Sequence, residues 1–186
     1  MKENKLKLFV AIPVPQNLKQ DIRKFIESNS SVANVRWLPE ENWHVTLFFI
    51  GFVNENKLDS INEKLTKEIK LKSPFTLHFE KFSMEGKPSQ YSMIWFRFKF
   101  SETFSEISEE IKRALKKELE QVQEFKRSIP HITLARLRKS VKRKEINLNF
   151  TPDTKETEVS DCQLWQSIGT TSGMVYKNLF NYDFRK

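Results

Sequence analysis

The chain has 186 residues, a mass of 22.2 kDa and a formal net charge of +8. Its length fits one domain, and its 38% hydrophobic content, with sixteen phenylalanines, is enough to form a core. No apolar run approaches the roughly 20 residues that span a bilayer, and a single cysteine excludes an intramolecular disulfide. We therefore expect one domain, residues 1–186, that is soluble and cytoplasmic and has no membrane partner.

The first half of the chain alternates strands with amphipathic helices. Short apolar runs that end at turn residues predict strands. Apolar residues spaced by three and four predict helices, as at Ile61, Leu65 and Ile69. In chain order the predicted elements are a strand at 6–12, a helix at 17–28, strands at 35–38 and 43–52, and a helix at 58–69.

The second half repeats this order of elements. Residues 92–100 alternate strictly, with Met93, Trp95 and Arg97 on one side and Ile94 and Phe96 on the other. The predicted elements are strands at 75–82 and 92–100, a helix at 103–122, and strands at 129–137, 158–166 and 174–183. Each half thus contains a strand, a helix and a histidine-bearing strand, which indicates an α+β fold with an approximate internal repeat.

A His-x-Thr-Leu tetrapeptide occurs in each half. His44-Val45-Thr46-Leu47 returns 87 residues later as His131-Ile132-Thr133-Leu134. A strand places residues i and i+2 on one face, so each copy presents an imidazole beside a hydroxyl. Alternation also predicts Phe48 and Ile50 on the face of His44. If the halves pack around a pseudo-twofold axis, the two His/Thr pairs face each other across a cleft.

Two opposed imidazoles suit in-line displacement at phosphorus. Imidazole titrates near neutral pH, so one ring can accept a proton from the nucleophile while the other donates a proton to the leaving oxygen. The threonine hydroxyls, Thr46 and Thr133, can donate hydrogen bonds to the non-bridging oxygens. A carboxylate nucleophile is not required for this chemistry.

Two other interpretations of the tetrapeptides are possible. One copy alone is most simply an ordinary amphipathic strand, but two copies in matching contexts favour a shared site. A zinc site is the other alternative, since histidine is a common ligand. Neither copy, however, belongs to a His-x-x-x-His or Cys-x-x-Cys set. We therefore predict no metal and no cofactor.

The remaining prominent residues are given structural or general roles. Between Lys112 and Lys144 there are twelve Lys or Arg residues and three acidic residues, which suits either a solvated surface or a polyanion such as RNA. The third histidine, His78, lacks a threonine two positions on, so we interpret it as a structural strand residue. The four tryptophans are expected in the core.

Several further segments extend the tetrapeptides into a longer pattern. They are Leu8-Phe9-Val10-Ala11-Ile12, Val35-Arg36-Trp37, Asn42-Trp43-His44-Val45-Thr46-Leu47-Phe48-Phe49-Ile50-Gly51, Pro130-His131-Ile132-Thr133-Leu134-Ala135-Arg136, and Leu164-Trp165-Gln166-Ser167 followed by Gly173 and Tyr176. As a set these segments resemble the 2H phosphoesterase superfamily. Within it they are similar to the RNA 2′,3′-cyclic phosphodiesterases of bacteria and archaea, also called 2′-5′ RNA ligases.

The resemblance implies a bilobal fold with two pseudo-symmetric lobes. Each lobe would have an antiparallel sheet with helices outside, and the active-site cleft would lie between the sheets. It also implies hydrolysis of a terminal RNA 2′,3′-cyclic phosphate to a 2′-phosphate, with a 2′-5′ ligase reaction in reverse. By this resemblance His44 is the proton donor, His131 the proton acceptor, and Thr46, Thr133 and Arg136 bind the phosphate. Strict alternation would point Arg136 away from His131, so its role requires a bulge or twist.

The implied partner is RNA with a cyclic phosphate end, including tRNA halves, and the implied oligomeric state is a monomer. Two alternatives remain open from the residues. The same chemistry could act on a small nucleotide, such as ADP-ribose 1″,2″-cyclic phosphate or 2′-5′ oligoadenylate, because the motifs address only the phosphate. A non-catalytic RNA-binding module could use the basic second half of the chain.

Overall fold

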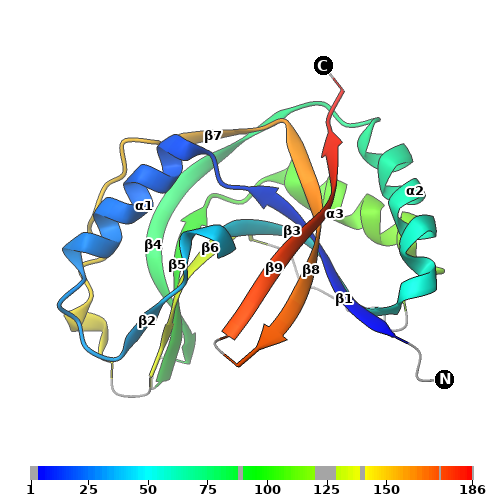
Figure 1. The fold of residues 1–186 in the computed structure, drawn as a ribbon. Coiled ribbons are helices and arrows are strands. Elements are labelled where there is room, and N and C mark those ends of the chain that lie inside the picture. Colours follow the sequence, from blue (N-terminus) through cyan, green and yellow to red (C-terminus); the bar gives the residue numbers. More distant parts are fainter. Residues whose placement is uncertain (1–3, 88–89, 120–128, 139–140, 172, 186) are drawn as a thin grey trace.

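The computed structural model describes residues 4–87, 90–119, 129–138, 141–171 and 173–185 (Figure 1). Its strands are β1 (Lys5–Pro13), β2 (Val35–Trp37), β3 (His44–Asn54), β4 (Phe75–Lys87), β5 (Gln90–Phe98), β6 (His131–Leu137), β7 (Glu156–Val159), β8 (Asp161–Thr170) and β9 (Gly173–Asp183). Its helices are α1 (Gln16–Ser28), α2 (Leu58–Ile69) and α3 (Glu102–Leu115), with short 3-10 turns η1 (Glu40–Asn42), η2 (Glu55–Lys57) and η3 (Arg143–Glu145). None of the described helices is long and apolar enough to cross a membrane.

The described strands form one curled antiparallel sheet in the order β7-β4-β5-β6-β3-β1-β8-β9, with β2 also paired to β6. Two groups of strands can be distinguished in it. We call β1, β3, β8 and β9 the first lobe, and β2, β4, β5, β6 and β7 the second lobe. The lobes meet where β3 and β6 pair, at Val45 and Ile132. The largest apolar cluster contains residues of both lobes.

The helices cover the outer faces of the lobes, and α1 and α3 do not cover the lobes that their place in the sequence suggests (Figure 1). Helix α1, from the first half of the chain, packs on the second lobe, where Phe25 stacks on Phe82 of β4 with ring centroids 3.8 Å apart. Helix α3, from the second half, packs against α2 and β3. Helix α2 in turn contacts β9, and Tyr182 donates a hydrogen bond to Asn62 across 2.9 Å. The two halves therefore exchange helices.

Most predicted elements are confirmed, and two predicted boundaries are wrong. The helix expected at 103–122 ends at Leu115. Glu118 then folds back on α2, where it accepts hydrogen bonds from Ser60 and Lys64; residues 120–122 lie outside the described part of the chain. The single strand expected at 158–166 is two strands that break at Ser160, because β7 pairs with β4 in the second lobe whereas β8 pairs with β1 in the first.

The stacked contact between α1 and β4 generates a stability prediction. Phe25 is fully buried, so Phe25→Ala removes a large apolar side chain and leaves a cavity. We expect a loss of about 3–5 kcal/mol in the free energy of unfolding, measured by urea denaturation. Phe52 on β3 is 56% exposed and provides the matched control. Phe52→Ala should cost about 1 kcal/mol or less, and an equal loss in both variants would contradict the assigned packing.

Candidate active site

The two histidine-bearing strands lie side by side. β3 and β6 are antiparallel and pair at Val45 and Ile132, which are both buried. Since neighbouring residues on a strand point to opposite faces, the residues that flank this pair project to the other face of the sheet. They are His44, Thr46, His131 and Thr133. The structure therefore brings both predicted His/Thr pairs together on one face, which we call the site face.

An irregularity in β3 changes which residues share the site face. The register between β1 and β3 shifts opposite Leu47, so that Leu47 and Phe48 are both buried in the core. Phe49 instead packs with the small aromatic cluster beside His44. The prediction that Phe48 and Ile50 share the face of His44 is therefore wrong, because a bulge reverses the alternation after Leu47.

A second irregularity brings Arg136 to the site face. The register between β5 and β6 shifts opposite Leu134, and Leu134 and Ala135 are both buried while Arg136 is exposed. Burial raises the pKa of the nearby Tyr176 phenol, and the positive charge of Arg136 opposes that rise. Tyr176 in turn lies 5.1 Å from the ring of His44. The bulge thus directs Arg136 toward the histidines, which strict alternation would not allow.

His44 lies in an aromatic setting. Its ring is 4.9 Å from Phe9, 5.2 Å from Trp165 and 5.1 Å from Tyr176, measured between centroids. Nδ1 lies 2.8 Å from the carbonyl oxygen of Asn42. A carbonyl only accepts hydrogen bonds, so Nδ1 carries a hydrogen and donates it. In the neutral ring Nε2 then carries the lone pair, which accepts a hydrogen bond from the Thr46 hydroxyl 3.1 Å away.

His131 has the same backbone contact in different surroundings. Its Nδ1 donates to the carbonyl oxygen of Ile129 across 2.8 Å, again two residues earlier in the chain. One ring face stacks on Trp95 of β5, with centroids 3.6 Å apart and an interplanar angle of 16°. Both histidines are therefore held in one tautomer by the backbone, and both leave Nε2 available for chemistry.

Burial favours the neutral form of both rings. It lowers the pKa of His44 from 6.5 to about 4, although the hydrogen bond to the Asn42 carbonyl opposes the shift and the charge of His131 adds to it. Burial also lowers the pKa of His131, where the Ile129 carbonyl and Glu85 oppose the effect and Arg97 adds to it.

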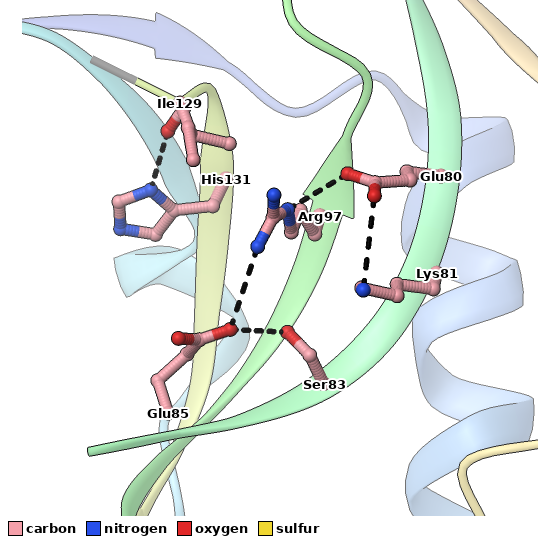
Figure 2. Close-up of polar contacts among 7 residues, drawn as sticks. All are labelled: Glu80, Lys81, Ser83, Glu85, Arg97, Ile129 and His131. Carbon is pink, nitrogen blue, oxygen red and sulfur yellow. Dashed lines mark hydrogen bonds and ion pairs between the residues drawn. The ribbon is translucent and has the colours of Figure 1, made fainter. Parts of the chain in front are cut away.

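A charged network lies beside His131 (Figure 2). Arg97 of β5 is the direct cross-strand partner of His131. It donates to Glu80 across 2.7 Å and lies 4.0 Å from a carboxylate oxygen of Glu85. Glu85 also accepts a hydrogen bond from Ser83 across 2.7 Å. Arg97 is thus balanced by two carboxylates, and Glu85 offsets part of its effect on the imidazole.

A cavity of about 1000 Å³ opens beside His131 and Thr46. Thr46, Phe49, Trp95 and His131 line it on the sheet side, while polar residues of α3 line the opposite side. One histidine and one threonine of the two His/Thr pairs therefore adjoin a volume large enough for a nucleotide-sized molecule.

The structure also tests the positions predicted for His78 and for the tryptophans. His78 is exposed on β4 with Nδ1 3.4 Å from Glu156, outside the site face. The expectation that all tryptophans belong to the core is wrong for Trp95, which stacks on His131 at the cavity. The alternation of residues 92–100 predicts that Trp95 and Arg97 lie on the side opposite the apolar face. Their contact with His131 could be found only from the pairing of β5 with β6. Within the described residues, no three His, Cys, Asp or Glu side chains gather to hold a metal ion.

Comparison with known proteins decides the family. Residues 14–171 match the family described as the 2′-5′ RNA ligase superfamily. The chain belongs to this superfamily. An Archaeoglobus fulgidus protein named RNA 2′,3′-cyclic phosphodiesterase is 30% identical over 177 residues, covering 94% of this chain and 98% of that protein. A Thermotoga maritima protein of the same name is 26% identical over 183 residues, covering 96% of each.

Solved structures share the fold of this superfamily member. E. coli LigT, solved in complex with 3′-AMP, has a TM-score of 0.78 at 18% identity, covering 98% of this chain and 100% of that one. A Thermus thermophilus protein also has a TM-score of 0.78, at 21% identity, covering 97% and 98%. The family and the α+β fold predicted from the sequence are confirmed, as is the prediction of an enzyme of the phosphodiester-hydrolysing class.

The lowered pKa of His44 predicts a loss of stability in acid. Its pKa in the folded protein, about 4, is below the roughly 6.5 of an unfolded chain. Between these values the unfolded state binds more protons, so the stabilisation is present above pH 6.5 and is lost as pH falls toward 4. His44→Gln should therefore lose less stability than wild type between pH 7 and pH 4, by about 3 kcal/mol in urea denaturation. His78→Gln controls for the loss of one imidazole, and an identical pH dependence in wild type and His44→Gln would contradict the assignment.

Removing the charge of the Glu85 carboxylate is expected to change the pKa of His131. Glu85→Gln removes the negative charge that opposes the lowered pKa of His131, while an amide oxygen can still accept from Ser83. We expect the pKa of His131, followed by NMR titration of its ring, to fall further below its ordinary value. Glu156→Gln, beside His78 on the surface, is the matched control. An unchanged or raised pKa of His131 in Glu85→Gln would disprove the coupling.

Proposed function

We propose that this protein is an RNA 2′,3′-cyclic phosphodiesterase that hydrolyses a terminal cyclic phosphate to a 2′-phosphate. The observation that carries the proposal is the pair of imidazoles on one face of the sheet. In each ring Nδ1–H donates a hydrogen bond to a backbone carbonyl, so that Nε2 is the nitrogen that can accept or donate the transferred proton. Membership in the superfamily and the names of its relatives support the substrate class.

The reaction uses one proton acceptor and one proton donor. His131 Nε2 takes a proton from water as the water oxygen attacks phosphorus, and the bond from phosphorus to O3′ breaks. His44, protonated on Nε2, gives its proton to O3′. The product is a 2′-phosphate with a free 3′-hydroxyl. Thr46, Thr133 and Arg136 hold the non-bridging oxygens, where charge must be stabilised during the transfer.

The depressed pKa of His44 constrains how the donor acquires its proton. With its pKa near 4, His44 is neutral at pH 7 in the absence of a nearby anion. A bound phosphate within about 4–6 Å favours the charged imidazolium and raises that pKa. Binding and protonation are therefore linked, and the imidazolium, surrounded by aromatic rings, donates readily once negative charge develops on O3′. His131, which burial also keeps neutral, suits the acceptor role.

The same geometry supports 2′-5′ ligation. If the 5′-hydroxyl of a second RNA takes the place of water, His131 takes the proton of that hydroxyl, O3′ departs with the proton of His44, and the product is a 2′-5′ linkage. The proposal includes RNA ends such as tRNA halves as partners, a monomeric state and a cytoplasmic location. A single cysteine, buried on β8, fits a reducing compartment.

The decisive assay is incubation with an RNA that ends in a 2′,3′-cyclic phosphate, in excess chelator, with the position of the product phosphate determined. We expect a 2′-phosphate from wild type. His44→Ala and His131→Ala should each lower kcat by about 10²–10⁴-fold, as expected for the loss of a general acid or base. Their melting temperatures should stay close to that of wild type.

His78→Ala, which removes a histidine outside the site, should retain full activity. A 3′-phosphate product would overturn the assigned roles, since it requires O2′ to depart. A panel that includes ADP-ribose 1″,2″-cyclic phosphate and 2′-5′ oligoadenylate, compared by kcat/KM, separates RNA ends from small nucleotides. Salt-sensitive RNA binding without turnover of any cyclic phosphate would instead favour a non-catalytic RNA-binding module.

A further inference from the structure

The arginines of the site face differ in how their charges are balanced. Arg97 has two carboxylate neighbours, Glu80 and Glu85 (Figure 2). Arg136 and Arg36 have none: among the described residues, neither forms a hydrogen bond or ion pair, and both are exposed. The two lie directly opposite each other in the antiparallel pairing of β2 with β6. Their positive charges are thus placed side by side without an internal counterion.

The orientation of Arg36 follows from its neighbours on β2. Val35 and Trp37 are partly buried against the main core, and Trp37 meets Phe25 of α1 edge to face at 6.0 Å. Arg36, between them, must project to the opposite face. Cross-strand partners share a face, so Arg36 and Arg136 point the same way, which is the side that the β6 bulge makes common with the histidines.

Such an arrangement costs stability in the free protein. Like charges directly opposite each other on neighbouring strands are destabilising, and an acidic residue at either position would remove the repulsion. A guanidinium is planar and binds two oxygens of a phosphate group through two parallel hydrogen bonds, so a pair of arginines in this position suits a phosphate anion. The negative charge that would neutralise the two arginines therefore comes from an anion outside the chain.

The two ends of the site carry opposite charge. At the cavity end α3 contributes Glu102, Glu106, Glu109 and Glu110 to the lining, and the cations beside them, Lys112 and Arg113, pair with Glu109 and Glu110. At the other end of β6 lie the two arginines. A polyanion that enters the site is repelled along α3 and attracted along β2. The nucleotide chain should therefore leave the histidines toward Arg36.

We propose that Arg36, beside Arg136, provides a second phosphate site that binds the phosphodiester on the 5′ side of the terminal nucleotide. Arg136 also faces the reacting phosphate, from the strand that carries His131, and Arg36 lies opposite it on β2, which pairs with the same edge of β6 as β3. The site makes the enzyme selective for ends of polynucleotides over free cyclic mononucleotides. This inference rests on the proposed function, since it assigns a binding site to the part of the RNA that precedes the cyclic phosphate.

The test compares two substrates that differ by one phosphate. They are adenosine 2′,3′-cyclic phosphate and its 5′-phosphorylated form, which carries an anion where the proposed site expects one. Wild type should prefer the 5′-phosphorylated form, and Arg36→Gln should lower kcat/KM for that form by about ten- to hundredfold. Hydrolysis of the form without a 5′-phosphate should not change. Arg36→Lys, which keeps the charge but not the planar fork, should retain part of the preference.

Salt dependence and stability provide independent readouts. For a cyclic-phosphate oligoribonucleotide, the slope of log binding constant against log salt should be shallower by about 0.7 in Arg36→Gln, the value for one lost phosphate contact to a single strand. The melting temperature should be unchanged or higher, because repulsion is relieved. A purely structural role for Arg36 predicts a lower melting temperature and an equal loss on both substrates.

Arg185→Gln is the matched control, because it removes an exposed arginine that follows β9 and belongs to neither β2 nor β6. It should leave the substrate preference intact. If wild type hydrolyses neither nucleotide nor any RNA end, the proposed function fails. If wild type hydrolyses both forms, and Arg36→Gln keeps the ratio between them, only the second phosphate site is overturned.

Discussion

The pairing of Val45 with Ile132 is the contact on which the arrangement of the site depends. This pair joins the two lobes into one curled sheet and points inward, so the flanking imidazoles and hydroxyls must project together from the other face. Antiparallel pairing with a period of two makes this outcome sensitive to register. A slip of one residue in β3 or β6 would send His44 or His131 into the core. The large apolar side chains beneath both strands oppose such a slip, because each would have to leave the core at the same time.

The charged groups of the site are less stable in the free protein than they would be with a bound anion. Both imidazoles lie where the neutral form is favoured, and two arginines face each other at the edge of the site without a carboxylate between them. Each feature costs stability in the free protein and becomes favourable when an anion arrives. Regions that depart from the most stable arrangement are characteristic of functional sites, because the ligand supplies what the fold lacks. By contrast, Arg97 on the same face is fully countered within the protein by Glu80 and Glu85.

Sequence reasoning could locate the two histidine strands because the tetrapeptide repeat and the period-two alternation are both local signals. It could place Trp95 and Arg97 opposite an apolar face for the same reason. The bulges at Leu47 and Leu134 could not be derived from the residues themselves, since a bulge depends on the strand with which it pairs. Only the family resemblance required a bulge or twist, before Arg136. The two bulges decide that Phe48 is buried and that Arg136 joins the site. The break at Ser160 was hidden for a related reason, because the strands on either side of it belong to different lobes.

The exchange of helices between the halves has a consequence for how the chain folds. Helix α1 is made early in synthesis, but the sheet it covers is completed only after β4, β5 and β6 have followed. Its apolar face, with Phe25 at the centre, meets Trp37 of β2 early but lacks its stacking partner Phe82 until β4 has followed. Contacts between such distant segments raise the contact order and slow folding. Neither half of the sequence contains both a sheet and the helix that covers it. The chain is therefore expected to gain its structure in one late, cooperative step rather than lobe by lobe.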